Sequence, residues 1–484
     1  MKRRDFLKAA SIAGATRVII PASLTMHSLL NKAYAAAPNY AAAVLTPPSA
    51  AAMPRVINIF LYGGPSDLAA NLTNIGDINL NSQTSYANTI NGITTTTAAD
   101  ATNGQINSRG FWKDAGGTEM SEMVTDGQMT VYRTLTKRKE DSRSHRQSIF
   151  MGLKGSLDID NTPGMGTRIA TLMDLNRGVL NGSAALGGKT VDQLVLPFVS
   201  FEGATTAFAP DPSRSLPLTL KGITLSETLD NPFARDLGVD AAYNAELNAL
   251  IDKVVTAQHR VRYSKAVDSF VLRQQMEGLV DGLRGELAGN IYPANNGYSG
   301  RIKAAVTLAL STNADSFFIT VGGGLGGWDD HNNGTDRYAD RMRQLMQALR
   351  FAVNNHIANS ASPHKNNIVI NVFGEFGRHC NLNASSGWDH GNTQILYTLG
   401  APGSAGAGQV RPVGALGKVV GKTQRVGPSK QNNQDLMPTN DSYEAEPMAI
   451  ASTVYKYFGV QNPEVLTSND SPLNESVADE PSLF

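Results

Sequence analysis

The chain has 484 residues, of which 42 are lysine or arginine and 42 are aspartate or glutamate, so its formal net charge is zero. A balanced charge creates no field that would attract nucleic acid or an acidic membrane surface, so we expect no nucleic-acid partner. The hydrophobic fraction of 41% is typical of a globular chain, and one cysteine cannot close an internal disulfide, so packing, alone or with a metal ion, must hold the fold.

The N-terminus has the layout of a twin-arginine export signal. The basic pair Arg3 and Arg4 precedes an alanine-rich apolar segment, and the small residues that end at Ala35 offer a signal-peptidase site. Arg17 and Pro21 interrupt the apolar segment too early for a stable membrane span. We predict a signal peptide over residues 1 to 35, read by the twin-arginine export machinery, and a periplasmic or secreted mature chain without a membrane span. An ordinary secretory signal or an uncleaved anchor is the alternative.

Two polar or alanine-rich segments interrupt the remaining chain. Residues 36 to 54, rich in alanine and proline, are typical of a linker, and residues 84 to 108 of a long polar loop. We expect neither to contribute to the core. Residues 55 to 484 are predicted to form a single domain.

Short apolar runs enriched in β-branched and aromatic residues recur beyond the linker and are typical of buried strands. Segments with helical spacing lie between them. Because strands that alternate with helices form parallel β-α-β units, we predict an α/β fold with a mostly parallel sheet and helices on both faces. The predicted strands cover residues 56 to 61, 129 to 135, 196 to 201, 315 to 321, 367 to 373 and 394 to 399.

Two segments carry the clearest helical pattern. The stretch from 241 to 287 repeats apolar residues at helical spacing, and we predict one long helix or a helical hairpin inserted into the domain. A second helix is predicted from an apolar face with a period near 3.6, formed by Tyr338, Met342, Leu345, Leu349 and Val353.

Polar residues follow several predicted strands at the point where each strand ends. Because the carboxyl ends of parallel strands share one edge of an open sheet, residues far apart in the sequence can meet there in one crevice. The segments are YGGPSD after residue 61, DSRSHRQ after a basic loop that follows residue 135, GGGLGGWDDH after residue 321 and GEFGRH after residue 373.

Carboxylates and histidines in these segments predict a divalent metal site. Asp329 and His331 stand two apart, and an oxygen with an imidazole nitrogen suits zinc or manganese better than calcium. Glu375 follows another strand, and GWDHGN adds Asp389 and His390. Like charges gathered at one edge repel unless a cation compensates them, so we predict that these residues ligate metal. A polar loop with an exposed histidine is the alternative.

Three further residues are candidates for the chemistry around the metal. The planar fork of Arg378 suits the oxygens of a phosphate or sulfate, or it forms a salt bridge to Glu375. Ser144 and His145 precede a predicted helix, where backbone amides favour an anion, and His145 is predicted to help hold that anion. The serine is then either a nucleophile beside the metal or a helix N-cap.

Two other motifs support weaker interpretations. The run GGGLGG at residues 322 to 327 matches a dinucleotide-binding fingerprint, but WDDH follows where an apolar helix should begin, so a nicotinamide oxidoreductase is the least favoured interpretation. Cys380 stands beside His379 without a sign of thiol activation, and we interpret it as incidental or as a minor metal contact.

These segments together resemble the exported bacterial proteins that carry the domain of unknown function 1501, which look like members of the alkaline phosphatase and sulfatase superfamily. The matching pieces are FLYGGPSD, SHRQSIFMG, PGMGTRIA, LPFVSF, GGWDDH, FGEFGRHCNLNASSGWDHGN and AIASTVYKYFGV, in order after the signal. The resemblance implies a doubly wound α/β sheet with a metal-bearing crevice. It also implies a first metal on Asp329, His331 and His390, a second on Glu375 and an acid of GGPSD, and Ser144 in the nucleophile position.

The chain departs from the family pattern at two positions. Where the family often has a carboxylate in the first segment, this chain has Ser66, so Asp67 must serve as the ligand or the ligand is missing. Where many superfamily enzymes have histidine after the strand-end acid, Phe376 follows Glu375. The sequence therefore leaves one or two ions as alternatives.

The sequence thus predicts an exported, metal-dependent hydrolase of phosphate or sulfate esters that uses zinc or manganese. Its substrate would be a small-molecule or polysaccharide ester. The alternative is a non-catalytic cell-envelope or polysaccharide-associated protein that keeps the hydrolase fold.

Overall fold

The computed structural model describes most of the chain beyond the predicted signal peptide. Residues 1 to 35, most of the loop from 84 to 108 and nearly all of the segment from 241 to 287 lie outside the described residues. Within the described part of the chain, no helix has both the length and the apolar character that crossing a bilayer requires. The described residues are 39–47, 52–66, 94–95, 105–106, 109–229, 249, 253, 279, 282–323, 327–383, 385, 387–400, 415–426 and 435–480.

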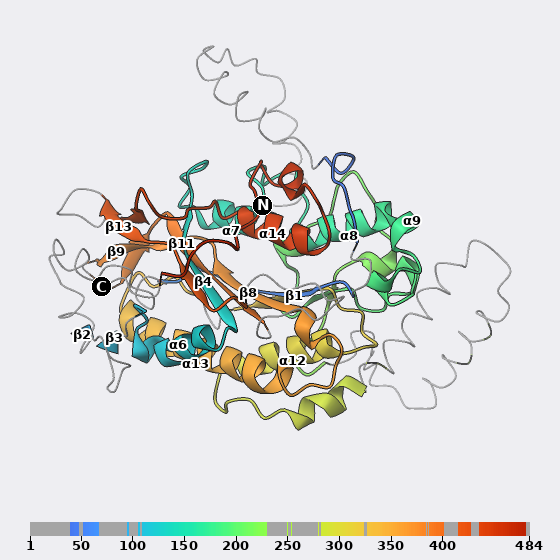
Figure 1. Ribbon diagram of the computed structural model, residues 1–484, viewed down its shortest axis with the longest axis horizontal. Coiled ribbons are helices and arrows are strands. Elements are labelled where there is room, and N and C mark those ends of the chain that lie inside the picture. The colour runs from blue at the N-terminus through green and yellow to red at the C-terminus, as the bar shows by residue number, and fades with distance from the viewer. Residues whose placement is uncertain are drawn as a thin grey trace, which may run out of the picture. The chain divides into compact units, whose positions relative to one another are not determined.

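An eight-stranded sheet forms the centre of the domain, in the order β12-β4-β11-β8-β1-β7-β5-β6 (Figure 1). Only β11 runs antiparallel to its neighbours, β4 and β8. The predicted α/β fold with a mostly parallel sheet is confirmed, and all six predicted strands lie in this sheet. Its strands are β1 (Arg55–Leu61), β4 (Met129–Thr136), β5 (Phe198–Ser200), β6 (Ile223–Thr224), β7 (Phe318–Gly322), β8 (Ile368–Gly374), β11 (Thr393–Gly400) and β12 (Lys418–Val420).

Three two-stranded sheets complete the described strands. The pair β9–β10 lies in the chain between β8 and β11, two neighbouring strands of the central sheet. These pairs are β2 (Thr94–Thr95) with β3 (Gln105–Ile106), β9 (Arg378–Leu382) with β10 (Trp388–His390), and β13 (Thr423–Val426) with β14 (Asp435–Pro438).

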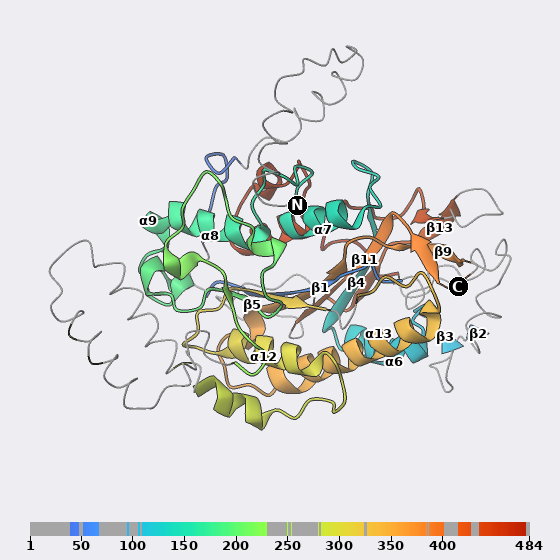
Figure 2. The ribbon, with the colours of Figure 1, turned by 180° about the vertical axis from the view of Figure 1, so that it is seen from behind.

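Helices cover both faces of the central sheet, and the two opposite views agree on their placement (Figures 1 and 2). One face carries α7 (His145–Lys154), α8 (Met165–Leu175), α9 (Arg177–Leu180) and α14 (Ala449–Tyr457). The other carries α6 (Gly117–Thr125), α12 (Ser299–Leu310) and α13 (Gly334–Phe351). Single 3-10 turns occupy Lys113–Ala115, Ala184–Leu186, Val191–Gln193, Thr206–Phe208, Leu218–Leu220, Lys365–Asn367 and Pro463–Leu466.

Strand β1 shows why its sequence is almost continuously apolar. Successive side chains of a strand point to opposite faces of the sheet. Ile57 and Ile59 belong to the core that includes α13, whereas Val56 and Phe60 belong to the core that includes α14. Since helices cover both faces, both sets of side chains are mostly apolar. The buried exception, Asn58, accepts a hydrogen bond from the Asn371 amide of β8 at 3.0 Å.

Helix α13 has the apolar face that the sequence predicts. All five side chains of that face have 0% exposure, and the last of them, Val353, lies in a π-helical extension, Ala352–Ile357. The helical path therefore continues beyond Phe351 as a π turn.

The segment predicted as a linker contributes to the core, so that part of the prediction is wrong. Leu45 and Met53 are buried with the residues of α14, and Leu45 forms a bridge with Val460. The segment pairs with the chain just beyond α14: the backbone N–H of Thr46 donates to the Gly459 carbonyl oxygen, and that of Gln461 donates to the Val44 carbonyl oxygen, both at 2.9 Å.

Acid should destabilise the fold through His356. Its Nδ1 lies 2.9 Å from the Tyr292 hydroxyl in the core, and burial, assisted by the charge of Lys303, lowers the pKa of His356 to about 4. Between about pH 6.5 and 4 the unfolded chain therefore binds a proton that the folded chain does not, so the free energy of unfolding falls as pH falls. We expect the free energy of unfolding, measured by urea denaturation, to fall by roughly 2 kcal/mol less in His356→Gln than in wild type when the pH is lowered from about 7 to 4.5. Equal losses in both proteins would contradict this assignment.

Candidate metal centre

The carboxyl ends of neighbouring strands bring three loops together. Leu61 pairs with Gly374 in the parallel register of β1 and β8, and the backbone N–H of Gly63 donates to the Glu375 carboxylate. Gly63 has a φ of +110°, and a Cβ there would lie 2.4 Å from the backbone nitrogen of Asp329. Glycine is therefore required where the loop after β1 touches the loop after β7.

Asp329, His331 and His390 present their ligand atoms to one another. His331 Nε2 lies 3.1 Å from Asp329 Oδ1 and 3.0 Å from His390 Nε2, and His390 Nε2 lies 3.5 Å from Asp329 Oδ1. Two ligand atoms bound to zinc at about 2.1 Å with a tetrahedral angle are about 3.4 Å apart. The spacing of these three residues, which the sequence predicts as metal ligands, fits one small divalent ion.

The Nδ1 contacts fix which nitrogen of each imidazole faces the cluster. His331 Nδ1 lies 3.1 Å from the Asp389 carboxylate, and His390 Nδ1 lies 2.9 Å from the carbonyl oxygen of Arg143. Since both partners accept hydrogen bonds, each Nδ1 carries the proton and each Nε2 presents a lone pair. Burial, with the charge of Arg378, lowers the pKa of His390 to about 4, so this ring is neutral at neutral pH. Two facing lone pairs beside a carboxylate repel one another unless a cation lies between them.

His145 supplies a third imidazole from the first turn of α7. Its Nδ1 lies 2.8 Å from Glu375 Oε2, and its Nε2 lies 3.7 Å from Asp329 Oδ2. The ligand atoms of His145, Asp329 and His390 all lie within 4.8 Å of one another. With His331, three imidazoles face one carboxylate, and such nitrogen and oxygen donors fit zinc or manganese.

Glu375 and Asp389, which the sequence predicts as ligands, contact the histidines from behind. The two oxygens of Glu375 accept from Gly63 and from His145. Asp389 Oδ1 accepts hydrogen bonds from His331 Nδ1 at 3.1 Å and from the side-chain amide of Asn383 at 3.2 Å. A carboxylate that binds the outer nitrogen of a ligand histidine fixes the orientation of its ring. These contacts favour a positioning role for both acids.

Arg378 is a buried cation that holds the centre together. Its side chain has 0% exposure, and Nη2 lies 2.5 Å from Asp329 Oδ1. Burial alone would raise the pKa of Asp329, but the hydrogen bond and charge of Arg378 bring it below its usual value. Neither role that the sequence suggests for Arg378, anion binding or a salt bridge to Glu375, describes these contacts. Its remaining contacts are with the backbone carbonyl oxygens of Gly63, Gly64, Trp328 and Trp388 and with His331 Nε2.

The turn after β7 sends two adjacent carboxylates to different partners. The side chain of Asp329 is 43% exposed and faces the histidines. Asp330 has 0% exposure, and its Oδ2 accepts from Arg341 at 2.6 Å. Only the first acid of WDDH is therefore available to a metal.

Ser144 occupies the N-cap position of α7, beside His145. It is exposed, it has extended backbone angles (φ −77°, ψ 127°), and its side chain makes no capping hydrogen bond. The N-cap position agrees with one of the two predicted roles, while the uncapped hydroxyl is compatible with the other. Asp67, residues 324 to 326 of the glycine run and the side chain of Cys380 lie outside the described part of the structure.

Two cations near the centre are not anticipated by the sequence prediction. Arg143 Nη1 lies 3.0 Å from His379 Nε2, and the Arg143 side chain is 36% exposed. Lys137 lies 5.2 Å from the Phe376 ring, and burial lowers the pKa of Lys137 to about 7. Phe376 also packs 4.3 Å from the ring of His390. The basic loop after β4 was the available signal for both cations.

Comparisons with known proteins give little further information. No protein-family model and no curated protein matches the chain. One similar solved structure, described as Ps i-CgsB in complex with k-i-k-neocarrahexaose, has a TM-score of 0.32 and 10% sequence identity, and the match covers 86% of this chain and 75% of that chain. A likeness this distant carries no conclusion about this chain.

Removing either central histidine should abolish metal binding. We expect His331→Ala and His390→Ala each to lower the metal content per chain at least about tenfold, because each change removes a ligand. Both variants should also lose the rise in Tm that metal gives the wild-type protein. Elemental analysis and thermal melts with and without chelator measure these effects. His364→Ala is the matched control, and wild-type metal content in both central variants would refute the assignment.

Asp389→Asn separates positioning from ligation. If Asp389 only orients His331, the variant should bind metal about 10- to 100-fold more weakly but reach the wild-type stoichiometry at saturation. Competition titrations with a chelating dye measure both quantities. The control is Asp340→Asn, which changes an exposed acid on α13. A reduced stoichiometry at saturation would instead make Asp389 a direct ligand.

Proposed function

We propose that the chain is an exported, metal-dependent hydrolase of phosphate or sulfate esters. We further propose that its domain is doubly wound and of the alkaline phosphatase type, and that it belongs to the domain of unknown function 1501 family. The observation that carries the proposal is the convergence of three imidazole Nε2 atoms on the Asp329 carboxylate, at the carboxyl edge of a mostly parallel sheet. When bound, zinc or manganese would polarise an ester oxygen and lower the pKa of a nearby hydroxyl.

A hydrolase of this kind needs an open coordination position on its ion. Catalytic zinc sites have three protein ligands and leave a fourth position to water or substrate. Asp329, His331 and His390 have separations of 3.0 to 3.5 Å. His145 lies 3.7 Å from the other oxygen of Asp329, close enough to be a fourth ligand or to contact the ester. We assign the ion to the first three residues, and His145 to the side where the ester binds.

The N-terminus of α7 supplies groups for the ester. Ser144 is exposed, and its hydroxyl makes no capping hydrogen bond, which suits a nucleophile. The first backbone amides of this ten-residue helix point toward its N-terminus and favour an anion. Arg143 precedes the serine and adds a positive charge on a side chain that is 36% exposed. These groups replace Arg378 as candidates for holding the phosphate or sulfate.

A non-catalytic envelope or polysaccharide-associated protein is the second candidate. Four protein ligands would close the coordination sphere, and closed zinc sites are structural. The engagement of Arg378 with backbone carbonyls and the apolar ring of Phe376 beside His390 also favour this alternative. Export through the twin-arginine route fits both candidates, because a chain exported in its folded state can acquire its metal beforehand.

Turnover of model esters tests the hydrolase proposal. Metal-loaded protein should release nitrophenol from nitrophenyl phosphate or nitrophenyl sulfate, and chelation should stop the reaction. We expect Ser144→Ala to keep its metal and lose at least about a thousandfold in kcat, as removal of a nucleophile does. Asp329→Ala should lose both metal and activity. Ser226→Ala, at an exposed serine of another segment, is the control.

The variant His145→Ala distinguishes the two candidates. With an open site, it should keep the ion and lose turnover. Loss of the ion in His145→Ala, together with no turnover by the wild-type protein, would replace the hydrolase by the non-catalytic candidate.

A further inference from the structure

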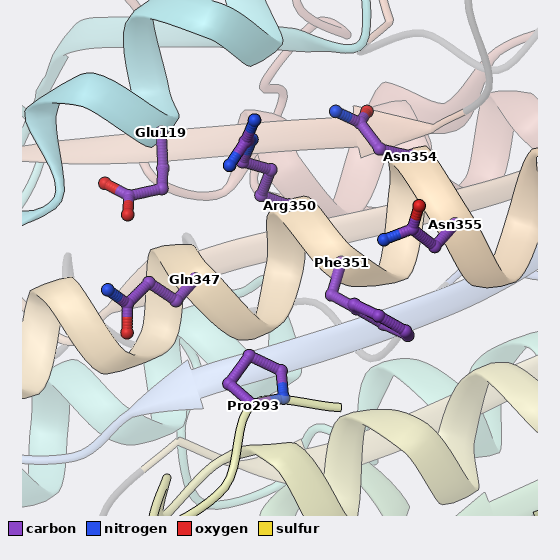
Figure 3. Close-up of a pocket in the computed structure, with 7 residues that line it drawn as sticks. All are labelled: Glu119, Pro293, Gln347, Arg350, Phe351, Asn354 and Asn355. Carbon is purple, nitrogen blue, oxygen red and sulfur yellow. The ribbon is translucent and has the colours of Figure 1, made fainter. Parts of the chain in front are cut away.

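A cleft of about 490 Å³ lies on the face of the sheet that α6 and α13 cover, and no residue of the metal centre lines it (Figure 3). Ligand sites in proteins are typically clefts of about 300 to 1,000 Å³. Figure 3 shows Arg350 between Glu119 and Asn354, with Pro293 below the helix. The lining residues are Glu119, Pro293, Gln347, Arg350, Phe351, Asn354 and Asn355.

Five of these residues form one stripe of a single helix. They stand at positions i, i+3, i+4, i+7 and i+8 from Gln347, a spacing that places side chains on the same face. The last two, Asn354 and Asn355, lie in the π-helical extension Ala352–Ile357. Single π turns inside α-helices occur frequently at functional sites. Four of the five residues are polar, although the opposite face of the same helix belongs to the core.

The polar groups of the cleft are mostly amides without excess charge. Gln347 and Asn355 each offer a carbonyl oxygen and an NH₂ group, so each can both accept and donate, and Asn354 adds a third amide. Asn354 Oδ1 is buried and has no hydrogen-bond partner among the described residues. Arg350 pairs with Glu122 at 2.6 Å, so the lining has no unpaired positive charge of its own to hold an anion, and Glu119 adds a carboxylate. A lining of this kind suits uncharged hydroxyl groups better than a phosphate or a nucleotide.

An aromatic ring at the cleft is held in place from the core side. The ring centroids of Phe351 and Tyr292 are 4.5 Å apart, and the Tyr292 hydroxyl lies 2.9 Å from His356 Nδ1. The ring is thus positioned before a ligand arrives, which reduces the entropy cost of binding. A flat apolar surface beside amide groups matches a sugar ring, which has C–H faces and a rim of hydroxyls.

We propose that this cleft binds a neutral saccharide chain. The amide stripe of Gln347, Asn354 and Asn355 recognises the sugar hydroxyls, and Phe351 packs against a sugar face. The site is separate from the metal centre, so it does not depend on the hydrolase proposal. A saccharide held there would keep the protein on a polysaccharide whether or not the metal centre turns over.

Calorimetric titration of the full-length protein tests this site, with maltohexaose, cellohexaose and mannohexaose as neutral probes and ATP as a charged probe. We expect at least one neutral hexasaccharide to bind and ATP not to bind. Gln347→Ala and Asn355→Ala should each weaken binding by about tenfold, since each removes a hydrogen-bonding amide from a partly exposed position. Asn359→Ala, at an exposed asparagine outside the lining, is the matched control and should bind like wild type.

The outcomes separate this proposal from the hydrolase proposal. Saccharide binding should persist with chelator and in His331→Ala, so a failure of the metal centre leaves the test intact. Absence of binding by every neutral probe, equal affinity in the cleft variants and the control, or binding of ATP in their place would overturn the saccharide site.

Discussion

The buried guanidinium of Arg378 is the interaction on which the arrangement of the centre depends. Its donors reach carbonyl oxygens in the loops after β1 and β7 and in β10, and its charge is paired with Asp329. Breaking a buried ion pair by removing one partner typically costs about 3 to 5 kcal/mol. Here the same removal would also leave the carbonyl groups of three segments without donors. The guanidinium of Arg378 therefore holds these loops together without a metal ion.

A metal ion meets a need that this guanidinium does not. Arg378 already compensates Asp329, and the other acids are occupied by Nδ1 atoms and amides. Arg378 Nη1 reaches His331 Nε2 only at 3.4 Å, whereas the Nε2 lone pairs of His331 and His390 face each other at 3.0 Å. The case for an ion consequently rests on the tautomers of the imidazoles. Counting acids at the sheet edge, as the sequence invites, leads to the same cluster of side chains but misses this reason for an ion.

The sequence predicts those features that local patterns encode. Six strands and the face of α13 follow from runs of apolar residues whose spacing matches one regular structure. The core role of Leu45 and Met53 depends on where the C-terminal helix lies, and no local pattern encodes that. Likewise, the sequence places Asp329, His331 and His390 at one edge, but the partners of Arg378 are backbone carbonyls, which side-chain chemistry cannot reveal. Glu375 contacts the Nδ1 atom of His145, and this contact depends on the rotamer of His145, which only the packed structure defines.

The antiparallel direction of β11 has a consequence for how the centre assembles. Because β11 runs opposite to β8, its amino end lies at the edge where β8 finishes, and a single excursion of the chain delivers Glu375, Arg378 and His390. These groups are neighbours in sequence and can meet early in folding, whereas His145 and Asp329 arrive only when the long-range parallel pairs have formed. Ion capture would then be a late event that reports a completed sheet. A partly folded chain would hold only His390 of the three proposed ligands and would release any ion it meets.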